Sequence, residues 1–177
     1  TKDNELNMHI ALITPFVTDP NHIDGGVAGV SKYLVDELVK KKNTKVTIIV
    51  PRSAGGETVH EIWDNFEVYR VGIKQLWDFL PATFYDMLVG KRQIAELIDF
   101  LRPDIVHFQG LTFLAATCKQ PNILTIHGIL ERDAIWDTRR NSIMRWPKWL
   151  LLKLTENFGR KRVPYIILIS EYVKQFL

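Results

Sequence analysis

Short apolar runs alternate along this chain with longer segments of helical periodicity. Runs of aliphatic and β-branched residues without polar interruption are typical of strands buried on both faces of a parallel sheet. We interpret six segments as strands, at 8–14 (MHIALIT), 46–50 (VTIIV), 67–71 (EVYRV), 105–108, 122–126 and 165–169. We expect Pro51 to end the second of them and residues 52–65 to be polar and irregular.

The segments between these runs carry helix signals. After Gly26, apolar residues recur at helical spacing, at Val27, Val30, Leu34, Leu38 and Val39. Further helices are predicted over 83–101, 112–118 and 142–158, and Ser170 and Glu171 suit the N-cap and first turn of a last one. Alternating strands and helices predict an α/β fold, a Rossmann-like domain with a mainly parallel sheet flanked by helices.

The organisation predicted is one domain over residues 8–177, preceded by a tag remnant or disordered lead-in at 1–7. The last strand is followed by the beginning of a new helix at the end of the chain. We therefore interpret the sequence as one domain of a longer protein.

Composition excludes several classes of function. The 177 residues carry a net charge of +3 and a single cysteine, Cys118, which has no partner for a disulfide or a zinc site. Cys118 is interpreted as a small buried hydrophobe. Without a long Lys/Arg block there is no warrant for nucleic-acid binding. No apolar run approaches the roughly 20 residues that span a bilayer, and no secretory signal is visible, so we expect a cytoplasmic protein.

The chemistry is expected at the carboxyl ends of the strands, because open α/β sheets bind ligands at that edge. Three predicted strands end there and are followed by polar turns that contain glycine. Gly25 and Gly26 open a helix after the first strand, Gln109 follows the fourth, and His127 with Gly128 follows the fifth. These residues lie far apart in the sequence, and the fold predicts that they share one rim.

The backbone conformations open to glycine give Gly25 and Gly26 a candidate role in ligand binding. Glycine lets the backbone take a positive φ and approach a ligand closely, and a helix N-terminus attracts a phosphate. The spacing fits equally well a simple turn with Asp24 near the cap. It is not the G-x-G-x-x-G dinucleotide fingerprint, and no Gly-Lys-Ser/Thr follows to make a P-loop.

His127 is the candidate for hydrogen bonding to a sugar hydroxyl or for stabilising charge during a reaction. A structural histidine is the alternative, and the strand-end position favours function. Gln109 is a candidate for bonding an acceptor, or a loop residue without a role. His22, Glu131 and Asp133 are candidates for the rim of an acceptor site. No residues form a Ser-His-Asp triad or a metal motif, so no metal is expected.

The segment 139–153 is basic, aromatic and aliphatic. It fits a helix on an anionic membrane surface with tryptophans at the interface. It also fits a helix that packs its Leu/Trp face on the sheet and keeps its basic residues in water, and we favour this second interpretation.

With these residues in place, the chain resembles the N-terminal domain of family 4 of the retaining glycosyltransferases with the GT-B fold. The matching stretches are MHIALITPF, DGGVAGVSKYLVDELVKKKNTKVTIIV, LRPDIVHFQG, ILTIHGI and YIILISEYVKQFL. The loop 18–23 differs from the family pattern, and the resemblance does not extend to a particular substrate.

The resemblance implies a domain that binds the acceptor, while a second domain, absent here, binds the nucleotide-sugar. Gly25 and Gly26 match the family's glycine loop near the donor phosphates and acceptor, and His127 matches a histidine that contacts the transferred sugar. The implied reaction moves a sugar to a saccharide, glycolipid or other hydroxyl acceptor without a metal or cofactor, and the chain alone is expected to be inactive. The alternatives are a nicotinamide-dependent oxidoreductase, which the glycine spacing disfavours, and a non-enzymatic ligand-binding or interaction module.

Overall fold

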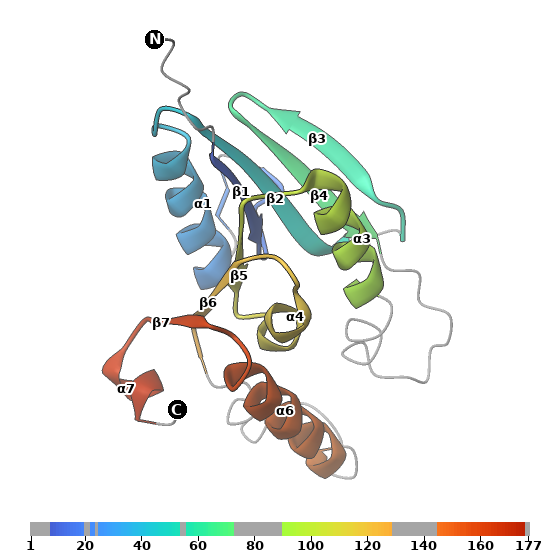
Figure 1. Cartoon of the computed structure of the whole chain (residues 1–177), viewed down its shortest axis with the longest axis vertical. Coiled ribbons are helices and arrows are strands. Elements are labelled where there is room, and N and C mark those ends of the chain that lie inside the picture. Colours follow the sequence, from blue (N-terminus) through green and yellow to red (C-terminus); the bar gives the residue numbers. More distant parts are fainter. Residues whose placement is uncertain are drawn as a thin grey trace.

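A seven-stranded sheet forms the centre of the computed structural model, with the strand order β3-β4-β2-β1-β5-β6-β7 (Figure 1). The structure describes residues 8–19, 22–23, 25–53, 56–72, 90–128 and 145–175. The strands are β1 (Met8–Ile13), β2 (Thr44–Ser53), β3 (Val59–Trp63), β4 (Phe66–Gly72), β5 (Ile105–Gln109), β6 (Asn122–Ile126) and β7 (Tyr165–Leu168). The helices are α1 (Gly26–Leu38), α3 (Lys91–Leu101), α4 (Thr112–Thr117), α6 (Arg145–Arg160) and α7 (Glu171–Lys174).

The sheet is parallel except for β3, which pairs antiparallel with β4. This confirms the predicted Rossmann-like α/β fold. Two hydrophobic clusters fill the two sides of the sheet. One joins α1 to β1, β2 and β4 through Leu12, Val35 and Ile48, and the other joins α3 and α4 to the strands through Ile98, Phe108 and Leu124. In Figure 1 the helix α1 lies on one side of the sheet and α3 and α4 on the other.

The prediction that Pro51 ends the second strand is wrong. β2 continues to Ser53, and Pro51 pairs with Val71 of β4. The register of β2 against β4 shifts between Pro51 and Ser53, while the pairing of β1 with β2 has already ended at Ile49. Pro51 therefore has no β1 partner that needs its missing N–H, and a proline is tolerated at such an irregular position.

The strand β3 lies inside the stretch that we expected to be irregular. Its side chains are mostly exposed, so its sequence lacks the apolar run that marks a buried strand. His60, which we expected in a loop, lies in β3 and stacks on Tyr69 of β4 with 4.2 Å between ring centroids. Pairing with β4, rather than a hydrophobic pattern, makes this segment a strand.

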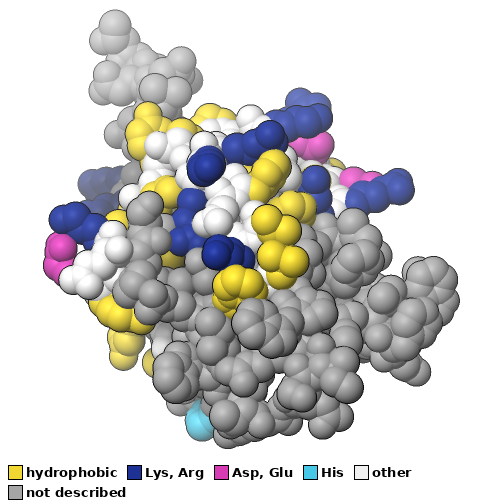
Figure 2. Space-filling view, turned by 90° about the horizontal axis from the view of Figure 1, so that it is seen from below, with side chains coloured by type: hydrophobic (Ala, Val, Ile, Leu, Met, Phe, Trp, Pro, Cys, Tyr) yellow, Lys and Arg dark blue, Asp and Glu magenta, His cyan; other side chains and the backbone are white. Residues whose placement is uncertain are grey.

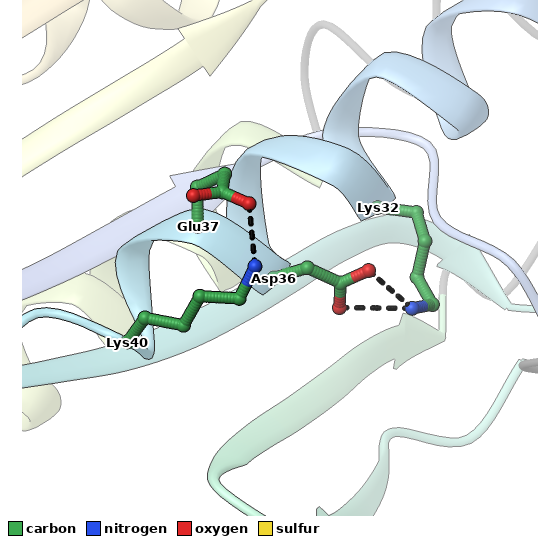
Figure 3. A network of polar contacts seen from close by, with 4 residues as sticks. All are labelled: Lys32, Asp36, Glu37 and Lys40. Carbon is green, nitrogen blue, oxygen red and sulfur yellow. Dashed lines mark hydrogen bonds and ion pairs between the residues drawn. The ribbon is translucent and has the colours of Figure 1, made fainter.

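The helix α1 confirms the prediction of an amphipathic helix, but its buried face differs from the expected one. Its fully buried positions are small or polar, at Ala28, Gly29 and Ser31, with Val35, whereas Val30 is exposed. Small residues allow the helix to lie close to the sheet. The helix also carries the half-buried ion pair Lys32–Asp36 at 2.7 Å, and the exposed pair Glu37–Lys40 at 2.6 Å follows at its end (Figure 3).

Three more helices agree with the sequence in the described residues. α3 begins at Lys91 and buries Ile94 and Ile98, while residues 83–89 of the predicted helix lie outside the described part. α4 ends one residue before the predicted end. In α7 the Ser170 side chain accepts a hydrogen bond from the Val173 N–H, which confirms the predicted N-cap.

The second half of helix α6 packs against α4. Most of the segment 139–153, for which we favoured packing on the sheet, has side chains outside the described part of the structure. Thr112 Oγ1 of α4 donates a 3.0 Å hydrogen bond to the buried carboxylate of Glu156. Gly159 of α6 lies directly against the backbone of Thr112. The side chains of Leu150 and Leu154 remain exposed, and Phe158 is partly exposed beside Phe113 of α4, with 6.2 Å between ring centroids.

Candidate functional site

The parallel register brings the predicted strand ends to one edge of the sheet. β1, β5 and β6 are consecutive in the sheet, and Figure 1 shows their carboxyl ends pointing to the lower end of the molecule, where α1 also begins. Figure 2 looks onto this end. In the described part of that face, Lys, Arg and hydrophobic side chains lie next to one another and acidic ones are few.

Strand alternation selects which side chains meet there. In β5, Val106 and Phe108 enter the cluster that packs on α3 and α4, so His107 and Gln109 emerge on the opposite face of the sheet. In β6, Leu124 and Ile126 occupy the same cluster. The polar side chains that follow this alternation, Thr125 and His127, therefore share a face with His107 and Gln109.

These four side chains form one hydrogen-bonded chain. Thr125 Oγ1 lies 2.8 Å from His107 Nε2, and Gln109 Nε2 lies 3.3 Å from the same nitrogen. Gln109 Oε1 is in direct hydrogen-bond contact with His127 Nε2. The structure thus brings together two predicted residues, Gln109 and His127, and adds two that sequence reasoning did not assign to the site.

Burial controls the charge of both imidazoles. Burial, and next the nearby charge of His127, lowers the pKa of His107. Burial also lowers the pKa of His127. Both rings are therefore neutral at pH 7, because an ordinary histidine is already mostly neutral there. A neutral imidazole offers one donor and one acceptor, which suits recognition of hydroxyl groups more than of anions.

Gln109 is not the loop residue that the sequence allowed. It is the last residue of β5, only 3% exposed, and both ends of its amide are engaged by histidines. A buried amide with both ends bonded holds its neighbours in place.

A second polar contact fixes the start of α1 relative to β1. Thr14, which follows β1, and Ser31 of α1 are both fully buried, and their hydroxyl oxygens lie 2.5 Å apart. Thr14 also donates to the carbonyl of Pro15 at 3.0 Å. Neither residue was predicted. Ser31 occupies a helical position between apolar neighbours, which was the available signal for a buried hydroxyl.

Gly25 and Gly26 lie at the beginning of α1, as predicted. Gly25 is the N-cap residue with φ +87°, a conformation that favours glycine. It offers no side-chain cap, and the first turn carries no acidic residue. A Cβ atom added at Gly26 would have no neighbour within 4 Å. The positive end of the helix thus has open space at Gly26.

Of the other residues singled out in the sequence, some lie in the described part of the structure and some lie outside it. Gly128 directly follows His127, and His22 is exposed in a short bridge with Asp19. Asp24, Glu131 and Asp133 lie outside the described residues, and so does most of the predicted basic segment up to residue 144. In the part of the chain that the structure describes, no group of three His, Cys, Asp or Glu residues could hold a metal ion.

Cys118 lies away from this edge, in a hollow between α3 and α4 that Lys91, Asp99 and Phe108 also line. It is a free, half-buried thiol, and burial raises its pKa. A raised pKa disfavours the thiolate, so Cys118 is not an activated nucleophile.

The order of strands and the crossovers define a Rossmann-like domain of the open α/β type, a class of fold in which ligands bind at the carboxyl edge of the sheet. The family model of Glycosyltransferase Family 4 matches residues 24–177, and the chain belongs to this family. No curated protein sequence matches it. Among the described helices, none combines the length and apolarity needed to cross a membrane.

Two solved structures of sucrose-phosphate synthase from Thermosynechococcus elongatus share the fold. The first aligns with a TM-score of 0.58 and 11% identity over 96% of this chain and 81% of that chain. The second aligns with a TM-score of 0.51 and 13% identity over 92% of this chain and 48% of that chain. The fold is therefore that of a GT-B glycosyltransferase domain, as the sequence predicted.

Proposed function

We propose that this domain binds the acceptor in a retaining glycosyltransferase that moves a sugar, such as a hexose, from a nucleotide-sugar to a saccharide, glycolipid or other hydroxyl acceptor. The observation that carries the proposal is that the hydrogen-bonded pair His127 and Gln109 lies at the same carboxyl edge of the sheet at which α1 begins. Family membership favours a transferase over the oxidoreductase and the interaction module.

His127 is proposed to contact the transferred sugar. Its neutral ring, anchored through Nε2 by a buried amide, leaves Nδ1 for a sugar hydroxyl. Gly25, Gly26 and Gly128 are proposed to let backbone approach the donor phosphates and acceptor. Backbone dipoles and basic residues then stabilise the departing nucleotide diphosphate, with no metal or cofactor.

The first test replaces His127 by alanine in the full-length protein. We expect turnover of the nucleotide-sugar to fall about 100-fold or more, as for the loss of a positioned group at a reacting centre, while the thermal midpoint changes little. The matched control is His60→Ala, since His60 lies in β3 at the far edge of the sheet. Near-normal turnover of the His127 variant excludes this role.

The second test uses the open space at Gly26. Because an added Cβ has no neighbour within 4 Å, Gly26→Ala and Gly26→Val should fold normally. We expect affinity for donor or acceptor to fall progressively with side-chain size, measured by calorimetry. Equal binding constants in the three proteins contradict the close approach of a ligand at this glycine.

Retention is tested on the product itself. Proton NMR of the freshly formed glycoside reports the anomeric configuration, and we expect it to equal that of the donor. An inverted anomeric configuration in the product excludes the retaining mechanism but does not exclude a glycosyltransferase.

We further propose that α6 touches an anionic membrane surface on the cytoplasmic side. Residues 145–162 contain six Lys or Arg residues, and the one carboxylate among them, Glu156, is buried against α4. Leu150, Leu154 and Phe158 are exposed at intervals of four residues on the same helix. A stripe of exposed apolar side chains among cations fits the interface of a bilayer containing acidic lipids.

A further inference from the structure

A single buried amide separates two imidazoles at the carboxyl edge. Gln109 directs Nε2 toward His107 Nε2, at 3.3 Å, and Oε1 toward His127 Nε2. An amide nitrogen only donates hydrogen bonds and an amide oxygen only accepts them. The ring nitrogen that faces the amide nitrogen must therefore present a lone pair, and the one that faces the oxygen must present an N–H.

We infer that Gln109 forces His107 and His127 into opposite neutral tautomers, and that His107 is a positioning residue for His127. The hydrogen-bond arrangement gives His107 a proton on Nδ1 and His127 a proton on Nε2. Turning the amide by 180° exchanges the two tautomers, but the rings still differ. The opposite relation thus depends only on Gln109 lying between the two nitrogens.

The surroundings of His107 support this assignment. The Thr125 hydroxyl lies 2.8 Å from the same His107 nitrogen and can donate to it. A ring nitrogen that receives two donors carries the lone pair. A neutral histidine exposed to water favours the Nε2–H tautomer, so the Nδ1–H form of His107 is stabilised by its donors, with the Gln109 amide as the one that imposes it.

The consequence for the site lies at His127 Nδ1, and this step depends on the proposed function. With Nε2–H donated to Gln109, Nδ1 of His127 is an acceptor. It can accept a hydrogen bond from a sugar hydroxyl, whereas the other tautomer would present a donor there. His107 and Gln109 thus fix the direction of the hydrogen bond between His127 Nδ1 and a sugar hydroxyl, with the hydroxyl as donor.

The test is the tautomer state of each histidine in the ¹⁵N-labelled chain, measured by long-range ¹H–¹⁵N correlation spectra above pH 8. In the wild type we expect His107 as Nδ1–H and His127 as Nε2–H. Two histidines in the same tautomer overturn the inference, whether or not the protein transfers sugars. This readout needs no substrate, so it is separate from the failure of the proposed function.

Gln109→Glu is the decisive variant, because a carboxylate accepts from both rings. We expect His107 to change to the Nε2–H tautomer and the pKa of both histidines to rise, while His127 stays Nε2–H. Thr125→Val is the matched control, since it removes one donor to His107 but leaves the amide in place, and the two rings should stay opposite. An unchanged His107 tautomer in Gln109→Glu overturns the coupling. If that variant does not fold, the wild-type spectrum alone decides.

Discussion

Arg70 in β4 donates a 2.7 Å hydrogen bond from Nη2 to the main-chain carbonyl of Val17, in the segment that leads from β1 toward α1. The same guanidinium donates from Nε to Glu61 of β3 at 2.7 Å. One buried side chain thus ties the edge hairpin of the sheet to the segment that leads to Gly25. Phe16, the neighbour of Val17, packs edge-on against Trp63 and Phe66 of that hairpin.

Arg70→Met should lower the free energy of unfolding by about 1–3 kcal/mol, because the buried Val17 carbonyl loses its donor. Urea unfolding measures the change. Arg92→Met is the matched control, since Arg92 is exposed in α3 and pairs with Glu96 on the helix surface; it should change stability by less than about 0.5 kcal/mol. Equal effects of the two variants would remove the anchoring role of Arg70.

Gly159→Ala should destabilise the contact of α6 with α4. A Cβ at this position would lie 2.7 Å from the main-chain oxygen of Thr112, which has no freedom to move away. We expect a net loss of about 1–3 kcal/mol, measured by thermal or urea unfolding, even though alanine is the better helix former by about 0.5–1 kcal/mol. Gly26→Ala, with open space around its Cβ, is the control and should be neutral or stabilising.

Stability should fall as the pH drops below about 6.5, the ordinary pKa of histidine. His9, His107 and His127 all have lowered pKa values, chiefly through burial. The unfolded chain therefore takes up protons first on acidification, and stability present above that pH is lost as it falls through the folded-state values. The loss is measured as the change in the urea unfolding midpoint between pH 8 and 5.5. This range lies above the pH at which carboxylates titrate, so the change reports the histidines.

His107→Gln removes one of these groups and keeps a polar side chain beside Thr125. The loss of stability between pH 8 and 5.5 should be smaller in this variant than in the wild type. Identical pH dependence in the two proteins would show that His107 does not take part.

Leu154→Glu should weaken binding to vesicles of mixed neutral and anionic lipid by several-fold. Leu154 is 59% exposed on α6, so the change removes apolar surface and adds repulsion without disturbing the core. Ile62→Glu is the matched control, since Ile62 in β3 is 82% exposed and belongs to the other edge of the sheet. Sedimentation at low and high salt measures binding. No binding by the wild type at low salt, or equal loss in both variants, rules out the membrane surface.

The site was predictable where residue type and strand end coincide. His127 follows the run Ile123–Ile126, in which Thr125 is the single polar residue, and the rule for parallel sheets gives the edge at which it lies. His107 was not predictable, because its strand position gave no sign that it faces away from α3 and α4. Only the pairing of Gln109 with Thr125 across β5 and β6 brings its ring into reach of the same amide as His127.

The strand β3 and the packing of α6 against α4 are two further features of the fold that the sequence pattern did not predict. Val59–Trp63 has mostly exposed side chains and no buried-strand pattern, so its pairing with β4 and the packing of Trp63 against Phe16 make it a strand. The basic helix was predictable from its periodicity, but its partner depended on a close approach between Gly159 and Thr112.

The amino-acid sequence by itself determined the buried parallel strands, the helices between them, the family and the strand-end candidates, because burial periodicity and turn chemistry are local properties of the chain. The tertiary structure decided which polar groups share a hydrogen bond, which face of α1 and α6 is buried and where a proline can remain in a strand. Those outcomes depend on distances between residues that are far apart in sequence, and local periodicity carries no information about such distances.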